Sequence, residues 1–158
     1  MSRRLLLINP ANMLNGRAQH GPAQSAIPPL NLGYVAALTP SSWEVRIIDE
    51  NLRLEEGLPW EPDLVGLTAL TPNAPRAYAL AQHYRAAGIP VVLGGVHASA
   101  LPEEAARYVD AVVVGEAEGA WAQLLADFEA GHLQPLYDGG LGSLESLLLP
   151  RRSLYPGG

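Results

Sequence analysis

Short, continuously apolar runs recur along the chain and are separated by longer segments of mixed polarity. Five of these runs predict strands, at Leu5–Ile8, Val45–Asp49, Leu64–Thr68, Val91–Leu93 and Ala111–Val114. Most of them lack the apolar and polar alternation of half-exposed strands, as expected for parallel strands that helices cover on both sides. The pattern therefore predicts an α/β fold, a doubly wound, flavodoxin-like (Rossmann-like) five-stranded parallel sheet with helices on both faces.

The segments between the strands carry helix start and stop signals. One helix is expected to begin near Pro29. A longer helix has Thr71 as its N-cap and Pro72 at its first position, and a short helix begins at Pro102. The last helix is expected to end at Gly131, because glycine readily adopts the positive φ of many helix ends, and to bury an apolar stripe of Trp121, Leu124, Leu125 and Phe128.

The length and the apolar content of the chain limit what it can be. The chain has 158 residues, and 48% of them are hydrophobic. This length is enough for one domain with a buried core. No apolar run approaches the roughly 18 residues that a membrane span needs. The apolar stretch Leu5–Ile8 is too short for a signal peptide. We therefore expect a soluble, cytoplasmic protein with no membrane contact.

Two residue types are missing from the chain. It contains no lysine and no cysteine, and its formal charge is −6. Without lysine there is no P-loop lysine and no amine for a Schiff base. Without cysteine these residues form no disulfide, no thiolate metal site and no iron–sulfur cluster. The negative charge, which no basic stripe offsets, excludes nucleic acid as an expected partner.

Loops after the predicted strands are the expected site of function. In open parallel sheets, ligands bind at the carboxyl ends of the strands, near the point where the strand order reverses. Four loops are expected to meet there, namely residues 9–12, 69–73, 94–99 and 115–119. Glycine lets a ligand come close to the backbone, because it carries no Cβ. Paired glycines and short polar side chains favour a large flat ligand over a metal ion.

Six segments in a fixed order point to one family. They are Leu7–Pro10, Pro28–Tyr34, Ile48–Asn51, Pro62–Thr68, Gly94–Ser99 and Val112–Gly119. Each is weak evidence by itself, but together they span almost the whole chain. On these segments the chain resembles the N-terminal cobalamin-binding domain of radical S-adenosylmethionine (SAM) enzymes, a group that includes cobalamin-dependent methyltransferases. The resemblance implies that cobalamin is the cofactor of this domain.

The resemblance also implies how the cofactor is held. Cobalamin domains of the methionine synthase kind carry Asp-x-His-x-x-Gly after the first strand, and that histidine binds cobalt. Residues 9–16 contain no histidine. The implied mode is therefore base-off without a histidine ligand, with the nucleotide tail of the cofactor in a groove of the protein. No metal ligand and no catalytic residue is expected in this chain.

The expected cofactor-binding residues come from the loops at the carboxyl ends of the strands. They are Asn9, Pro10, Thr68, Ala69, Leu70, Thr71, Asn73, Gly94, Gly95, Val96, His97, Gly115 and Glu116. Some of them also have a plainer interpretation. His97 in a glycine-rich turn suits hydrogen bonding to neighbouring backbone. Glu116 suits the first turn of a helix, and Gly94–Gly95 suits a tight turn.

The composition divides the chain into two parts. Residues 1–138 are expected to form the cobalamin-binding domain, and residues 139–158, rich in glycine and proline, are predicted to be a linker. The resemblance implies that the linker leads to a radical SAM domain outside this chain, which holds a [4Fe-4S] cluster and S-adenosylmethionine. The cobalamin domain would present cobalt to it, commonly as methylcobalamin for methyl transfer. Catalysis by this chain alone is not expected.

Two other functions remain open. A stand-alone cobalamin carrier or sensor that docks on a partner would have the same domain. A flavodoxin-like FMN-binding protein would use the same sheet, but its phosphate loop after the first strand is usually dense in serine and threonine, and residues 9–15 have neither. A nicotinamide dehydrogenase is disfavoured, because no Gly-x-Gly-x-x-Gly follows the first strand.

Overall fold

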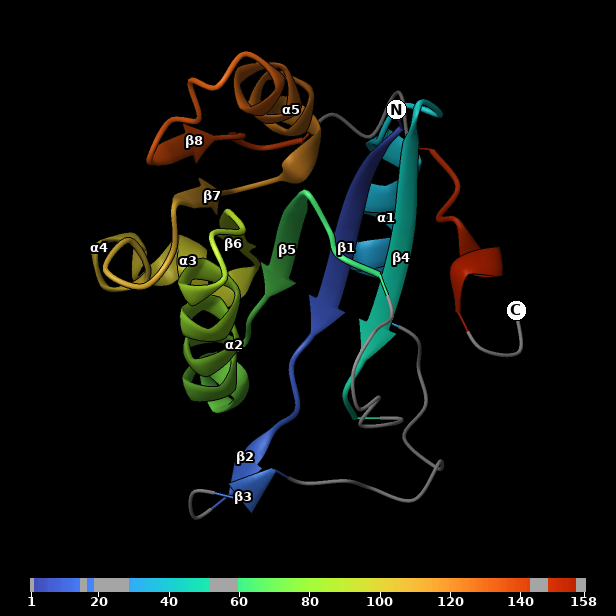
Figure 1. The fold of residues 1–158 in the computed structure, drawn as a ribbon. Helices are drawn as coiled ribbons and strands as arrows, with labels where there is room; N and C mark the ends of the chain where they lie inside the picture. Colours follow the sequence, from blue (N-terminus) through green and yellow to red (C-terminus); the bar gives the residue numbers. More distant parts are fainter. Residues whose placement is uncertain (1, 15–16, 19–28, 52–59, 143–147, 156–158) are drawn as a thin grey trace.

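A computed structural model describes residues 2–14, 17–18, 29–51, 60–142 and 148–155 (Figure 1). Pro28 of the second family segment lies outside these residues. So do residues 143–147 and 156–158 of the predicted linker.

A six-stranded sheet, in which every neighbouring pair of strands is parallel, forms the centre of the domain. Its strands, in spatial order, are β4 (Trp43–Asp49), β1 (Arg3–Asn9), β5 (Leu64–Thr68), β6 (Val91–Gly94), β7 (Ala111–Val114) and β8 (Leu136–Asp138). After β1 the chain first adds β4 on one side and then β5 on the other. The strand order therefore reverses between β1 and β5, which is where doubly wound sheets bind ligands.

The number of strands differs from the sequence-based expectation. All five predicted strands are present, but the prediction of a five-stranded sheet is wrong, because β8 adds a sixth next to β7. Only Tyr137 of its three residues is buried, so β8 lacks the continuous apolar run that marks the other strands. A small antiparallel pair, β2 (Met13–Leu14) and β3 (Arg17–Ala18), also has no apolar signature in the sequence.

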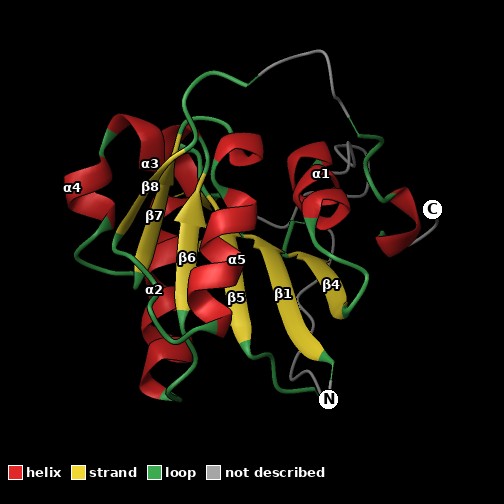
Figure 2. Cartoon of the chain, turned by 90° about the horizontal axis from the view of Figure 1, so that it is seen from above, coloured by secondary structure: helices red, strands yellow, loops and turns green. Residues whose placement is uncertain are grey.

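Helices cover both faces of the sheet (Figure 2). One face carries α1 (Leu30–Leu38) and α5 (Trp121–Glu129), and the other carries α2 (Ala74–Ala86), α3 (Val96–Ala100) and α4 (Pro102–Ala105). The predicted doubly wound arrangement is confirmed, and so are the helix starts near Pro29 and at Pro102. The five-residue helix α3 is too short to show a helical period in the sequence. None of the described helices is both long and apolar enough to span a membrane.

The ends of α5 and α2 differ in how well the sequence predicts them. Gly131, with φ 72°, ends α5 as expected, and its N–H donates to Phe128 O at 3.0 Å. The expectation of Thr71 as the N-cap of α2 is wrong. Thr71 lies in a 3-10 turn, and α2 begins after Asn73. The Thr71 hydroxyl is 3.2 Å from His97 Nδ1 instead, so it is turned away from the helix end.

Alternating residues of β1 join the sheet to both helix layers. Leu5 and Leu7 belong to the core under α1 and α5, whereas Leu6 and Ile8 belong to the core under α2. Successive side chains of a strand point to opposite faces, and all four of these are almost fully buried. Each such side chain contributes about 1.5–3 kcal/mol on burial. This double burial is the physical reason for the continuous apolar run.

Candidate functional site

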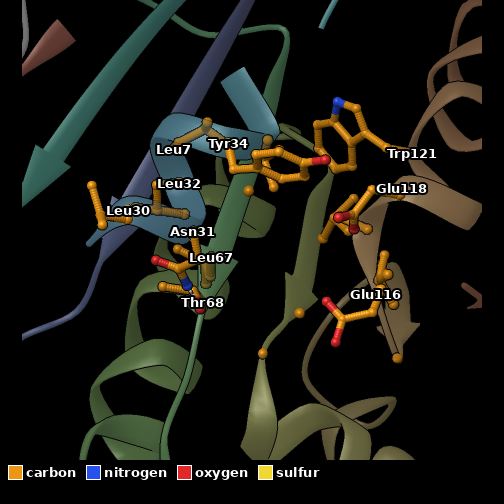
Figure 3. Close-up of a pocket in the computed structure, with 18 of the residues that line it drawn as sticks. Leu7, Leu30, Asn31, Leu32, Tyr34, Leu67, Thr68, Glu116, Glu118 and Trp121 are labelled. Atoms are coloured by element: carbon orange, nitrogen blue, oxygen red, sulfur yellow. Dashed lines mark hydrogen bonds between the residues drawn. The ribbon is translucent and has the colours of Figure 1, made fainter. Parts of the chain in front are cut away.

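A pocket of about 370 Å³ lies between the sheet and the helices α1 and α5 (Figure 3). Its lining residues come from β1, β5, β6 and β7 of the sheet, from α1 and α5, from the loops after β6 and β7, and from the C-terminal segment. They are Leu7, Leu30, Asn31, Leu32, Tyr34, Val35, Gly66, Leu67, Thr68, Val92, Gly94, Gly95, Val113, Gly115, Glu116, Ala117, Glu118, Trp121 and Pro150. The pocket thus lies at the point where the strand order reverses.

Gly66, in the middle of β5, leaves room in this pocket. A Cβ at Gly66 would lie 2.7 Å from Leu7 Cδ2 and 3.9 Å from the ring of Trp121. Glycine inside a strand weakens the strand and often marks the close approach of another group. Here the missing side chain keeps the space between the sheet and Trp121 open.

Gly95 joins the end of β6 to the end of β5. Its φ is 95°, and a Cβ there would lie 2.8 Å from Thr68 Oγ1 and 2.9 Å from Ala69 O. The two loops are also hydrogen-bonded, because His97 N–H donates to Ala69 O at 2.9 Å. Only glycine allows this contact without strain. The plainer interpretation of Gly94–Gly95 as a tight turn therefore describes Gly95, while both glycines also line the pocket.

The loop after β7 is held by the end of β8. Glu116 N–H donates to Gly140 O at 3.1 Å. Gly115 has φ 76°, and a Cβ on it would lie 2.5 Å from Gly140 O. Gly140 follows β8, the strand that the sequence pattern does not predict. The contacts of Gly140 thus hold the loop that carries Glu116 and Glu118 on the pocket wall.

Tyr34 brings a polar atom into a mostly apolar pocket. Figure 3 shows its ring reaching across the pocket towards Trp121 and Glu118. Its hydroxyl oxygen is buried and makes no hydrogen bond of ordinary length to the described residues, although the Glu118 side chain and the Leu148 backbone lie near enough to act on its pKa. Burial, and after it the nearby Glu118 carboxylate, raises the pKa of Tyr34 above the ordinary value of 10.0. A buried hydroxyl without a partner is unfavourable, so a polar ligand atom is favoured at this point.

A second polar contact lies at the carboxyl end of β5. Asn31 Nδ2, on α1, donates to Thr68 Oγ1 at 2.9 Å. Because Thr68 Oγ1 accepts this bond, its own proton remains available for a ligand. The pair also ties the first turn of α1 to the sheet at the pocket mouth.

Exposed apolar side chains follow two of the strands beside the pocket. Leu70, in the loop after β5, is 54% exposed, and Val96, the first residue of α3 after β6, is 68% exposed. Their loops are held together by the contact between Gly95 and Ala69. Large exposed apolar side chains that gather at one edge of a sheet are typical of a surface that a ligand covers.

The structure separates the predicted cofactor-binding residues into two groups. Thr68, Gly94, Gly95, Gly115 and Glu116 line the pocket. The remaining ones belong to the same sheet edge but do not line this pocket, namely Asn9, Pro10, Ala69, Leu70, Thr71, Asn73, Val96 and His97.

The loop after β1 is fixed by buried hydrogen bonds. Asn73 Nδ2 donates to Pro10 O at 3.2 Å, and its Oδ1 accepts the N–H of Leu70 at 2.8 Å. Glu50 accepts the N–H of Ala11 at 3.0 Å. Asn73 therefore joins the loops after β1 and β5 and gives each a defined position at the sheet edge.

His97 is buried on the α2 side of the sheet. Its Nδ1 lies 3.2 Å from Thr71 Oγ1, and its Nε2 lies 3.0 Å from Tyr78 Oη. Glu104 Oε1 is 3.4 Å from the same Nε2 and accepts the Tyr78 hydroxyl at 2.9 Å. The side chain of His97 is thus engaged within the protein. Its partners are side chains, so the expectation of bonds to neighbouring backbone is wrong.

Sequence reasoning did not single out several pocket residues. Trp121 is expected only as a core residue of the last helix, and Tyr34 appears only within a family segment. Pro150 lies in the predicted linker, and Gly66 lies inside a strand. The available signal was Gly66, because an isolated glycine inside an apolar strand indicates a close approach.

Comparison with known proteins bears on what this pocket holds. The family model of the B12 binding domain matches residues 20–125. This chain belongs to the B12-binding domain family. The match confirms the resemblance inferred from the ordered segments. The matched residues include strands of the doubly wound sheet, which carries the pocket where its strand order reverses.

Relatives of this B12-binding domain are named as methyltransferases. Bacteriochlorophyllide d C-8(2)-methyltransferase of Chlorobaculum tepidum is 41% identical over 107 residues, which are 68% of this chain and 24% of the relative. Bacteriochlorophyllide d C-12(1)-methyltransferase of the same organism is 31% identical, over 85% of this chain and 29% of the relative. Hopanoid C-2 methylase of Rhodopseudomonas palustris is 30% identical, over 79% and 25%. This chain thus spans about a quarter of the length of these relatives.

Proposed function

We propose that this B12-binding domain holds cobalamin base-off, with the nucleotide tail of the cofactor in the pocket between β5, β6 and α1. The observation that carries the proposal is the apolar pocket of about 370 Å³ at the switch point of the sheet. This volume lies within the range of about 300–1,000 Å³ that is usual for small-molecule sites. Cobalamin as a whole is much larger, so the pocket would take only one part of it.

The residues of the pocket fit the tail of the cofactor. Its lower base is a flat aromatic ring system, and the pocket offers apolar walls from Leu32, Val92 and Trp121. The orphaned hydroxyl of Tyr34 and the free proton of Thr68 offer hydrogen bonds to the polar atoms of the tail. Gly66 and Gly95 leave space that a Cβ would fill. Size, shape and polarity therefore agree with this ligand.

The exposed loops beside the pocket suit the corrin ring. Leu70 and Val96 would contact its apolar edge, and the polar groups of the loops after β1 and β7 would meet its amide side chains. Asn9 ends β1 and Glu116 lies in the loop after β7. Pro10 is buried and would act by holding the loop in place, since its carbonyl accepts a hydrogen bond from Asn73 Nδ2 at 3.2 Å. A large flat ligand that covers Leu70 and Val96 would remove apolar surface from water, at about 25 cal/mol per Å².

The absence of a histidine ligand is part of the proposal. His97 is buried and engaged with Thr71, Tyr78 and Glu104. No histidine lines the pocket within the part of the chain that the structure describes. The domain would then bind the cofactor through its tail and its corrin ring, without a protein nitrogen on cobalt.

The names of its relatives support a role for the domain in a larger protein. All three relatives described above are named methyltransferase or methylase, so we propose that this domain serves methyl transfer. A following radical SAM domain, with its own [4Fe-4S] cluster and S-adenosylmethionine, would complete the enzyme. Cobalamin supplies a transferable methyl group when it is bound as methylcobalamin. The residues of this chain bind and orient it, and catalysis by this chain alone is not proposed.

The test uses one variant that fills the pocket. Gly94 lines the pocket, and a Cβ there would meet only Val113 atoms at 3.8 and 3.9 Å, so Gly94→Val is expected to fold. The matched control is Ala79→Val, on the exposed side of α2. After mixing with hydroxocobalamin and gel filtration, wild type and Ala79→Val should retain corrinoid. Gly94→Val should bind about tenfold more weakly, or worse.

Two results would contradict the proposal. A wild-type chain that retains no corrinoid would show that the domain does not bind cobalamin in this form. A Gly94→Val variant that binds as well as wild type would move the tail out of this pocket. A flavin spectrum on the purified protein would favour the FMN alternative.

A further inference from the structure

Helix α1 begins without a cap of its own. Its N-cap residue is Pro29, which offers no side-chain acceptor. The first N–H groups of a helix lack partners inside the helix and need them from elsewhere. Tyr155, near the C-terminal end of the described residues, bridges the two backbone groups that would otherwise close the first turn on each other. Its hydroxyl accepts the N–H of Gly33 at 2.7 Å and donates to Pro29 O at 2.5 Å.

The segment around Tyr155 makes further contacts with the same turn. We call residues 148–155 the strap. Arg151 N–H donates to Gly33 O at 2.9 Å. A Cβ at Gly33 would lie 3.0 Å from Tyr155 Oη and 3.2 Å from Pro150 Cβ, so glycine is what allows the strap to lie this close. Figure 2 shows the short 3-10 turn of the strap, next to the C label, beside α1.

Burial makes these hydrogen bonds matter. Tyr155 is only 6% exposed. Without the Tyr155 hydroxyl, the Gly33 N–H would lose this partner in a place that water does not readily reach, and a buried group without a good partner is unfavourable. The Pro29 carbonyl would keep the Leu32 N–H, which donates to it at 2.9 Å. The buried contact of the strap therefore fixes the position of the first turn of α1 more firmly than a solvent-exposed hydrogen bond would.

The first turn of α1 is also a wall of the pocket. Leu30, Asn31 and Tyr34 line it from the helix, and Pro150 lines it from the strap itself. A ligand in the pocket and the strap on the outside thus hold the same turn from two sides. Because both stabilise the same turn, cofactor binding should favour docking of the strap. Docking of the strap should favour cofactor binding to the same degree, since such coupling is reciprocal.

We propose that Tyr155 is a positioning residue for the cofactor pocket, and that docking of the strap and binding of the cofactor strengthen each other. This inference rests on the proposed function. Whatever follows the strap in a longer protein would then be connected to the occupied pocket through one buried tyrosine.

The variant Tyr155→Phe tests the inference, because it removes only the hydroxyl. The chain offers a closely matched control. Tyr137 is 7% exposed, and its hydroxyl likewise accepts one bond, from Gln134 N–H at 2.8 Å, and donates one, to Asp127 Oδ2 at 2.9 Å. It lies on β8, away from α1. Tyr137→Phe thus removes two similar hydrogen bonds without touching the strap.

Two measurements are needed on wild type and both variants. The first is the dissociation constant for hydroxocobalamin, which Tyr155→Phe should raise about three- to tenfold and Tyr137→Phe should leave unchanged. The second is amide hydrogen exchange of α1, which should become faster in Tyr155→Phe without cofactor and remain unchanged in Tyr137→Phe. Cofactor should slow exchange of the strap in wild type.

The outcomes separate this inference from the proposed function. If wild type binds no corrinoid, the proposed function fails, and the coupling fails with it. If wild type binds and Tyr155→Phe binds equally well, only the coupling fails. An equal loss of affinity in Tyr137→Phe would also overturn it, because the effect would then come from general stability.

Discussion

Gly95 and Thr68 stand so close that a Cβ on Gly95 would lie 2.8 Å from Thr68 Oγ1. Gly95 also has φ 95°, a conformation that side-chain-bearing residues rarely adopt. This contact joins the ends of β5 and β6 and thereby defines one side of the pocket mouth.

Gly95→Ala should therefore destabilise the protein by about 3 kcal/mol, because the positive φ costs about 1–2 kcal/mol and the clash adds to it. Gly88→Ala is the matched control. Gly88 has φ 76°, and a Cβ there would meet nothing within 4 Å, so it should cost only about 1 kcal/mol. Urea unfolding measures both. Equal losses would show that the contact with Thr68 is not tight.

The ion pair of Glu50 and Arg76 holds the loop after β1. Arg76 Nη2 lies 2.6 Å from Glu50 Oε1, and the buried carboxylate also accepts the N–H of Ala11 at 3.0 Å. Glu50→Gln should lower the free energy of unfolding by about 1–3 kcal/mol, because a hydrogen-bonded charge pair is lost at a mostly buried site.

The control for this change is Glu44→Gln. Glu44 pairs with Arg46 at 3.2 Å, but both side chains are exposed, so the loss should stay within about 0.5 kcal/mol. A Glu50→Gln variant as stable as Glu44→Gln would mean that the loop after β1 does not depend on Glu50.

Tyr34→Phe should leave the melting temperature of the cofactor-free protein unchanged or raise it slightly, because the hydroxyl that it removes is buried and makes no hydrogen bond of ordinary length to the described residues, although Glu118 and the Leu148 backbone lie near it. With cobalamin the same variant should bind more weakly than wild type, because the ligand would be the missing partner. Calorimetry gives both values. A lower melting temperature without cofactor would show that the hydroxyl already has a partner in the folded protein.

Alkaline pH should unfold the protein through its tyrosines. Burial raises the pKa of Tyr34, Tyr78, Tyr84, Tyr137 and Tyr155 above 10.0. A pKa that is higher in the folded state means that the neutral form is favoured there. This stabilisation is complete below pH 10 and is lost as the pH rises through the folded pKa values.

Tyrosinate absorbance and circular dichroism, followed together during a pH titration, test this expectation. Ionisation of the buried tyrosines should occur above pH 10 and coincide with loss of secondary structure. Ionisation of all tyrosines near their ordinary value, in a protein that stays folded, would contradict it.

The sequence predicts the strands well where both faces are buried. Leu5 to Ile8 and Val65 read as strands because each side chain meets a helix layer. β8 has only one buried residue, Tyr137. It forms a strand because it pairs with β7, and the local sequence pattern does not reveal this pairing. The position of Thr71 was missed for a related reason, since its hydroxyl is engaged by His97, distant in the sequence.

The candidate site was predictable at its glycines and less so at its walls. Gly94, Gly95 and Gly115 follow predicted strands, and strand ends are where ligands of such sheets bind. Trp121 has the same apolar pattern whether it lies in a core or lines a pocket. The contact of Tyr155 with Gly33 joins residues that are far apart in the chain, and it becomes visible only in the folded structure.

We propose that the domain holds cobalamin with neither the cofactor's own base nor a protein histidine on cobalt. Electron paramagnetic resonance of the chain loaded with cob(II)alamin tests it directly, because an axial nitrogen splits the cobalt signal. We expect retained corrinoid whose signal shows no nitrogen splitting. A signal with nitrogen splitting, or a chain that retains no corrinoid, would contradict the account.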